Sequence, residues 1–243
     1  MLNIVLIILY GALLNISLRN YLNSQSYSSL DELKIFSNSV LQSNYIFVIG
    51  ARVDELCASI LINANALGIY TKAKELGTML GTFSSKIVSR PWYYIACKLK
   101  PKNTSNIYFL SMLLLALIAT LLLPFLLYLL SLVVSFLGPN WTKLNDFSIF
   151  MALIFILYFF VQFSNSTLLA MGFEREQLII DRLILILKIA AYLFLLLSFY
   201  MQVFSLQIEL FFYIEILFRA INLLSQMCLM IWKRYDLDTK GTD

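Results

Sequence analysis

The sequence predicts an all-α integral membrane protein with seven transmembrane helices. Of its 243 residues, 60% are hydrophobic and only 13% are charged. A soluble domain of this size cannot bury so much apolar side chain. Several apolar runs reach about 18 residues, the length that spans a bilayer as a helix. The runs lack the strict polar–apolar alternation of a membrane β-barrel, so helices are expected.

The first predicted span covers residues 2–18, and the first positive charge, Arg19, follows it. Because positive side chains favour the cytoplasmic side, the N-terminus is expected outside. No cationic stretch precedes the apolar run and no small-residue cleavage site follows it, so a secretory signal peptide is not expected. Residues 19–34 form a polar connection, in which Ser29 and Glu32 have the spacing of a capping box for the next helix.

Six further spans are predicted at 33–65, 69–95, 107–137, 147–171, 178–200 and 206–232. Pro91 is expected to kink or end the third span near its last turn. Lys98, Lys100 and Lys102 place the following loop in the cytoplasm, and Lys233 with Arg234 places the C-terminus there. We therefore divide the chain into a first helix with its connection (1–34), a six-helix lobe (35–232) and a cytoplasmic tail (233–243).

The composition excludes several kinds of chemistry. There is no histidine, which removes the commonest acid–base group and metal ligand. Cys57, Cys97 and Cys228 are far apart and form no paired motif, so they indicate neither a zinc site nor a redox pair. No catalytic constellation is visible, so we expect neither an enzyme, a cofactor, a metal nor a nucleic-acid partner.

Polar residues recur at steps of three and four along the second and third spans, which keeps them on one helix face. In the second span they are Asn38, Gln42, Tyr45, Arg52, Glu55, Ser59 and Asn63, with Asp54 about 100° away from this stripe. In the third span they are Thr71, Glu75, Thr78, Thr82, Ser85 and Ser89. Such faces are costly against lipid, so we expect them to line a shared aqueous cavity. The alternative is that they contact other helices. The Gly77-x-x-x-Gly81 spacing predicts a close helix contact.

The last three spans also carry polar residues. Glu215 and Arg219 have the spacing of a pair within one helix. Lys188 has no acidic partner within one turn of its own helix, so it must snorkel, face a cavity or meet Glu215 across helices. The segment from Gln162 to Thr167 is expected to form hydrogen bonds between helices rather than a substrate site.

Four short stretches resemble Wzx-type polysaccharide flippases, members of the multidrug/oligosaccharidyl-lipid/polysaccharide exporter superfamily. Arg52-Val-Asp-Glu-Leu and Ala66-Leu-Gly-Ile-Tyr70, followed by Pro91, resemble the seventh and eighth helices of that family. Leu137-Gly-Pro-Asn-Trp141 looks like the loop after its ninth helix, and Leu169-Ala-Met-Gly172 resembles the end of its tenth.

This resemblance implies a MATE-like transporter of twelve helices in two lobes around a central cavity. The chain would correspond to the sixth helix and the complete second lobe. The family moves undecaprenyl-pyrophosphate-linked oligosaccharide outward across the bacterial inner membrane, in polysaccharide, lipopolysaccharide and O-antigen biosynthesis. The implied partners are a lipid-linked oligosaccharide, membrane lipid, and a second lobe from a separate chain or a second copy.

Arg52 is the residue we expect to bind the pyrophosphate, because a guanidinium donates in pairs to phosphate oxygens. The other candidate substrate-binding residues are Asp54, Glu55, Asn63, Lys188 and Arg219. Two alternative functions stay open at this point. One is a multidrug or small-molecule antiporter of the same superfamily, which would prefer an acidic cavity. The other is a membrane scaffold, or a gene remnant, that transports nothing.

Overall fold

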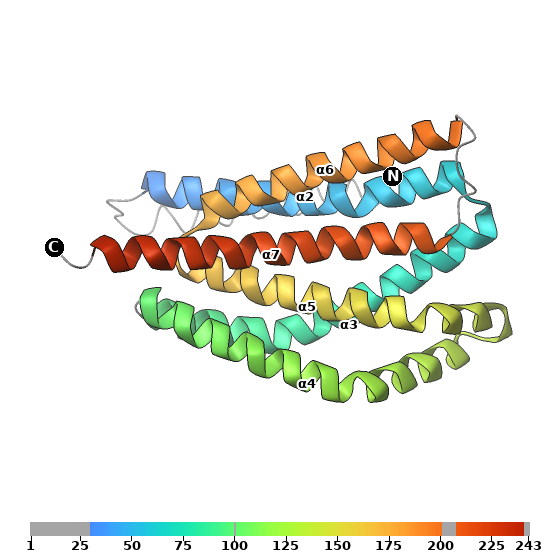
Figure 1. The fold of residues 1–243 in the computed structure, drawn as a ribbon, viewed down its shortest axis with the longest axis horizontal. Helices are drawn as coiled ribbons and strands as arrows, with labels where there is room; N and C mark the ends of the chain where they lie inside the picture. The colour runs from blue at the N-terminus through green and yellow to red at the C-terminus, as the bar shows by residue number, and fades with distance from the viewer. Residues whose placement is uncertain (1–29, 100, 201–207, 241–243) are drawn as a thin grey trace. The chain divides into compact units, whose positions relative to one another are not determined.

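The computed structural model describes residues 30–99, 101–200 and 208–240 (Figure 1). Within these residues every element is a helix, which confirms the predicted all-α class. The elements are α2 (Leu30–Leu61), α3 (Ala64–Lys98), α4 (Pro101–Phe136), the 3₁₀ helix η1 (Pro139–Phe147), α5 (Ser148–Ala170), α6 (Glu174–Tyr200) and α7 (Ile208–Lys240). The first predicted span, 2–18, lies outside the described residues.

The chain divides into two compact units, Met1–Leu41 and Gln42–Asp243, and α2 contributes residues to both. The described part of the first unit is the beginning of α2. The second unit contains the remainder of α2 and all of α3 to α7. Every contact of the candidate site lies within this second unit.

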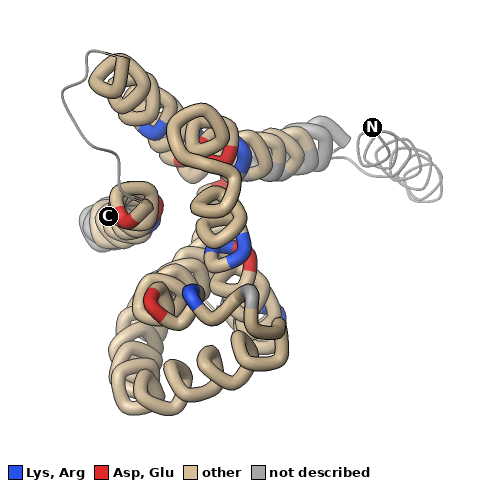
Figure 2. The backbone as a smooth tube through the Cα atoms, turned by 90° about the vertical axis from the view of Figure 1, so that its right-hand side faces the viewer, with Lys and Arg blue, Asp and Glu red and all other residues tan. Residues whose placement is uncertain are grey.

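Four described helical stretches are long and apolar enough to cross a membrane, and they support the predicted membrane class. They are Asn103–Phe136, Trp141–Ala170, Glu174–Tyr200 and Ile208–Lys233. The prediction counted α2 and α3 as spans too. Both are long, with 32 and 35 residues, but no described stretch of either is among the four that are long and apolar enough to span. Figure 2 marks the positions of the charged residues along the backbone in blue and red.

The tightest helix contact joins α3 to α5, and two glycines make it possible. A Cβ atom on Gly77 would stand 2.8 Å from the carbonyl oxygen of Met151, and one on Gly81 would stand 2.7 Å from Cδ1 of Tyr158. No side chain fits at such distances, so the two backbones approach only because both positions are glycine. The close contact predicted from the Gly77-x-x-x-Gly81 spacing is confirmed.

The helix boundaries depend on a few residues. Asn63 caps α3, because its side-chain oxygen accepts a hydrogen bond from the backbone N–H of Ala66 at 2.8 Å. Gly138 has a φ of +96° and redirects the chain from α4 into η1. Two ends differ from the prediction. Helix α3 continues past Pro91 to Lys98, and α7 continues past residue 232 to Lys240.

Candidate functional site

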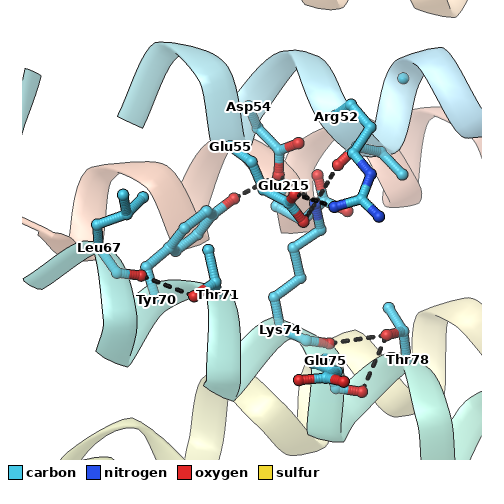
Figure 3. A network of polar contacts seen from close by, with 12 residues as sticks. Arg52, Asp54, Glu55, Leu67, Tyr70, Thr71, Lys74, Glu75, Thr78 and Glu215 are labelled. Carbon is cyan, nitrogen blue, oxygen red and sulfur yellow. Dashed lines mark hydrogen bonds and ion pairs between the residues drawn. The ribbon is translucent and has the colours of Figure 1, made fainter. Parts of the chain in front are cut away.

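Charged side chains from four helices form one continuous chain of ion pairs in the second unit. In order of contact they are Arg52, Glu55, Lys74, Asp54, Lys188, Glu215 and Arg219. Helix α2 supplies three of them, α3 and α6 supply one lysine each, and α7 supplies the last two. Figure 3 shows how the α2 and α3 members point toward one another, with Glu215 behind them. We call these seven residues the ion-pair network.

Asp54 is at the centre of the ion-pair network and is fully buried. Its Oδ2 atom accepts two hydrogen bonds, one from the Tyr70 hydroxyl at 2.5 Å and one from Nζ of Lys74 at 2.7 Å. Lys74 is also buried, and its ammonium donates to the backbone carbonyl of Ala51 at 2.7 Å. Burying charges is tolerated only when they are paired and hydrogen-bonded, and this pair meets that condition through Nζ of Lys74 and Oδ2 of Asp54.

Lys188 connects the α2–α3 half of the ion-pair network to α7. Its ammonium donates to Oε2 of Glu215 at 2.6 Å and to the carbonyl of Gly50 at 2.9 Å, and it lies 4.0 Å from Oδ1 of Asp54. Arg219 then pairs with the second oxygen of Glu215 at 2.6 Å. Of the three positions that the sequence left open for Lys188, the structure has the contact with Glu215 across helices. The predicted Glu215–Arg219 pair is confirmed, as part of a larger network.

The other end of the ion-pair network reaches the surface. Glu55 contacts Lys74 at 3.5 Å and Arg52 at 2.6 Å. The side chain of Glu55 is 27% exposed and that of Arg52 is 69% exposed, whereas Lys74 is only 5% exposed. The charges therefore run from an exposed arginine into the interior of the bundle. Arg52, the residue expected to lead in phosphate binding, is the outermost member.

The remaining candidate residues are placed differently. Asn63 is exposed, and its side chain caps α3 rather than joining the ion-pair network. In the α3 stripe, Glu75 is exposed and Ser85 and Ser89 are buried, so the stripe does not face one environment. The hydroxyl of Thr78 donates to carbonyls of its own helix. Within the described residues, no group of three or more Cys, Asp or Glu residues is arranged to hold a metal ion.

Lys74 is absent from the candidate residues predicted from sequence, although the sequence holds a signal for it. Lys74 lies four residues after Tyr70 and three before Gly77, so the three share one face of α3. That face packs into the bundle, because Gly77 meets α5. Asp54 likewise shares a face with the buried Cys57 and lies off the exposed stripe of α2. Lys74 and Asp54 thus each lie on a helix face that packs into the bundle.

A second group of polar side chains, outside the ion-pair network, joins the C-terminal part of α5 to its neighbours by hydrogen bonds. Thr167 accepts from Nε1 of Trp92 at 2.8 Å, and Ser164 bonds the hydroxyl of Tyr108 at 2.6 Å. Asn165 accepts from Gln226 of α7 at 2.5 Å. These bonds join α5 to α3, α4 and α7 and involve no charge. They confirm the predicted helix–helix role of the segment from Gln162 to Thr167.

Comparisons with protein-family models, with curated proteins and with solved structures found no match. The resemblance to Wzx-type flippases therefore stays a prediction from short sequence stretches. The observations that bear on function are the buried ion-pair network and the apolar helices beside it.

Proposed function

We propose that this protein takes part in moving a lipid-linked oligosaccharide, carried on a polyprenyl pyrophosphate, across the inner membrane of a bacterium. The observation that carries the proposal is the charge balance of the ion-pair network. Four cationic side chains, Arg52, Lys74, Lys188 and Arg219, meet three carboxylates, Asp54, Glu55 and Glu215, so one positive charge is in excess.

A charge inside a membrane helix bundle is expensive, and such groups usually serve transport or binding. An excess cation in a region of low dielectric attracts an anion far more strongly than it would in water. Pyrophosphate is a suitable anion, because lysine and arginine donate charge-assisted hydrogen bonds to its oxygens. A carrier of cationic drugs would need the opposite excess, so the charge balance favours the glycan lipid over the antiporter alternative.

The exposed side of α2 and α3 supports a partner for this chain. The side chain of Arg52 is 69% exposed, and that of Glu75 is 64% exposed. Neither charge is stable against lipid hydrocarbon. We propose that a second lobe, from a separate chain or a second copy, faces these helices across a water-filled cavity. The chain would have its N-terminus outside and its C-terminus in the cytoplasm, as the positive charges of its loops suggest.

A flipping assay in liposomes tests the proposal. The substrate is a disaccharide on a polyprenyl diphosphate with a fluorophore on the sugar, and dithionite quenches only the fluorophore that reaches the outer leaflet. The chain is reconstituted alone and together with any membrane partner that co-purifies with it. We expect quenching beyond the outer-leaflet share, and we expect Arg52→Ala to slow it.

Two controls make this assay specific. Fluorescent phosphatidylcholine, which carries no diphosphate, should be quenched no further than in empty liposomes. Lys143→Ala changes a cation of η1 that lies outside the ion-pair network, so flipping should be unchanged. If both preparations quench the diphosphate substrate no further than empty liposomes do, the proposed function is wrong. Equal rates for Arg52→Ala and the unmodified chain would remove Arg52 from the substrate path.

A further inference from the structure

We propose that Lys74 and Lys188 form a phosphate-binding clamp, and that the carboxylate of Asp54 occupies this clamp when no substrate is bound. The clamp is a site for a phosphate or diphosphate group. The inference rests on the proposed function only for the lipid that carries the phosphate. Its residues come from three helices: the lysines from α3 and α6, and the occupying carboxylate from α2.

The geometry places two ammonium groups on the two oxygens of one carboxylate. Nζ of Lys74 lies 2.7 Å from Oδ2 of Asp54, and Nζ of Lys188 lies 4.0 Å from Oδ1. The Tyr70 hydroxyl adds a third donor to Oδ2 at 2.5 Å. Two ammoniums and a hydroxyl around one oxyanion make a donor set suited to a phosphate group, whose oxygens are strong acceptors.

Asp54 fits this position incompletely. Its Oδ1 atom has no hydrogen-bond partner, although the residue is fully buried. The 4.0 Å to Lys188 exceeds hydrogen-bond length. An unpaired oxygen on a buried carboxylate is unfavourable. A phosphate has more oxygens and more charge than a carboxylate, so it can bond both ammoniums at once. The Asp54 carboxylate therefore leaves the ammonium of Lys188 without a hydrogen bond to the anion at this position.

The two lysines are positioned independently of Asp54. Lys74 donates to the carbonyl of Ala51 at 2.7 Å, and Lys188 donates to the carbonyl of Gly50 at 2.9 Å. These carbonyls belong to consecutive residues of α2. The ammonium groups are therefore held beside each other by the helix backbone, and they stay there when the Asp54 side chain turns away. Donors fixed in advance raise affinity, because less freedom is lost on binding.

The exposed end of the ion-pair network gives a route to the clamp. Lys74 also contacts Glu55, which is partly exposed and bonded to the exposed Arg52. A phosphate arriving at Arg52 replaces Glu55 there first, and then replaces Asp54 between the lysines. Each step exchanges one anion for another on the same cations, so the buried lysines keep an anionic partner throughout.

Direct binding measurements test the clamp on the full chain in lipid nanodiscs. The probe is radiolabelled farnesyl pyrophosphate, with farnesol and inorganic pyrophosphate as competitors. Asp54→Asn removes the occupying charge and keeps the shape of the side chain. We expect this variant to bind the probe about tenfold more tightly, the effect of gaining one charge-assisted hydrogen bond. The matched control is Glu176→Gln, which removes a carboxylate that pairs with Lys233 at 2.8 Å outside the ion-pair network, and it should leave the affinity unchanged.

A charge-neutral double variant covers the case in which Asp54→Asn does not fold. Asp54→Asn combined with Lys74→Gln removes one charge of each sign and should lose binding of the probe. Its control is Lys72→Gln combined with Glu75→Gln, which removes an exposed pair of α3 and should bind as the unmodified chain does. If the first double variant binds the probe as tightly as the unmodified chain, or if folded Asp54→Asn gains no affinity, the clamp is refuted.

The competitors distinguish recognition of the phosphate group from recognition of the lipid tail. Together with the flipping assay, they also test the clamp and the proposed function separately. If inorganic pyrophosphate displaces the probe as effectively as unlabelled farnesyl pyrophosphate does, the clamp recognises the phosphate group alone. Farnesol, which has no phosphate, should not compete. Displacement by farnesol would show a tail site and refute the clamp. Clamp-dependent binding without flipping in liposomes would refute the proposed function alone. Flipping without any effect of the clamp variants would refute the clamp alone.

Discussion

At the scale of single residues, burial separates two ion pairs of α3 that look alike in the sequence. Lys72 and Lys74 are two residues apart, and each pairs with a carboxylate at 2.8 and 2.7 Å respectively. The Lys72–Glu75 pair has exposed side chains, whereas Lys74 and Asp54 are 5% and 0% exposed. If the lysine is removed, water can stabilise the exposed carboxylate of Glu75, but it cannot reach the buried carboxylate of Asp54.

This difference predicts unequal costs for the same substitution. Lys74→Met leaves the Asp54 carboxylate buried without its hydrogen-bonded cation, which should lower the free energy of unfolding by about 3–5 kcal/mol. Lys72→Met removes half of an exposed pair and should cost less than about 1 kcal/mol. Thermal unfolding of both variants in one detergent gives the comparison. Equal melting temperatures for the two would mean that Lys74 is not buried in the folded chain.

The ion-pair network also shows which contacts helical spacing can predict and which it cannot. Helical spacing correctly paired Glu215 with Arg219, because both lie on one helix. It offered the Lys188–Glu215 contact only as one of three possibilities, and it left Lys74 without a partner. Spacing defines the faces of each helix, but contacts between faces depend on how helices pack. Arg52 drew attention because it lies on a regular polar stripe, yet such a stripe marks the exposed face of α2.

At the scale of elements, two of the three glycines of α3 have opposite surroundings. A Cβ on Gly77 would meet the backbone oxygen of Met151 at 2.8 Å, and Met151 belongs to α5. A Cβ on Gly68 would have nothing within 4 Å. A backbone oxygen cannot rotate aside as a side chain does, so Gly77 is required by packing while Gly68 is not.

Alanine at these two positions should therefore act in opposite directions. Gly77→Ala forces α3 and α5 apart and should destabilise the chain by about 1–3 kcal/mol, the usual cost of an overfilled contact. Gly68→Ala should stabilise it by about 0.5–1 kcal/mol, because alanine favours a helix interior over glycine. Melting temperatures in detergent measure both. A Gly77→Ala variant that melts at or above the unmodified chain would contradict the close packing.

The elements were predicted more completely than the site. Six predicted segments coincide with α2 to α7, since long apolar runs leave little choice but a helix. The differences lie at helix ends. Pro91 was expected to kink or end its helix, and it does not end it, because a proline removes only one backbone hydrogen bond and α3 continues to Lys98. Likewise Lys233 was expected to close the last helix, yet it pairs with Glu176 of α6 at 2.8 Å and α7 continues.

At the scale of the whole second unit, the chain reverses direction at each connection, so its turns gather at two ends (Figure 1). One end holds the last residues of α3, the first of α4, the turn at 171–173 and the last part of α7. The other holds the turn at 62–63 and η1. Among the described residues, basic residues concentrate at the first end, at Lys98, Lys102, Arg175, Lys233 and Arg234, while η1 contributes Lys143. This asymmetry predicts that the first end is cytoplasmic.

Cysteine labelling in intact cells tests this orientation. Cys57, Cys97 and Cys228 are first replaced by serine or alanine, because two of them are exposed. Thr142→Cys in η1 and Asn103→Cys at the start of α4 then place single exposed thiols at opposite ends. A membrane-impermeant maleimide should label position 142 in intact cells and position 103 only after permeabilisation. The reverse pattern would show that the orientation is opposite to the predicted one, with the basic residues outside the cell. Labelling of both positions from one side would mean that α4 does not cross the membrane, although its stretch Asn103–Phe136 is the most apolar of the four candidate spans.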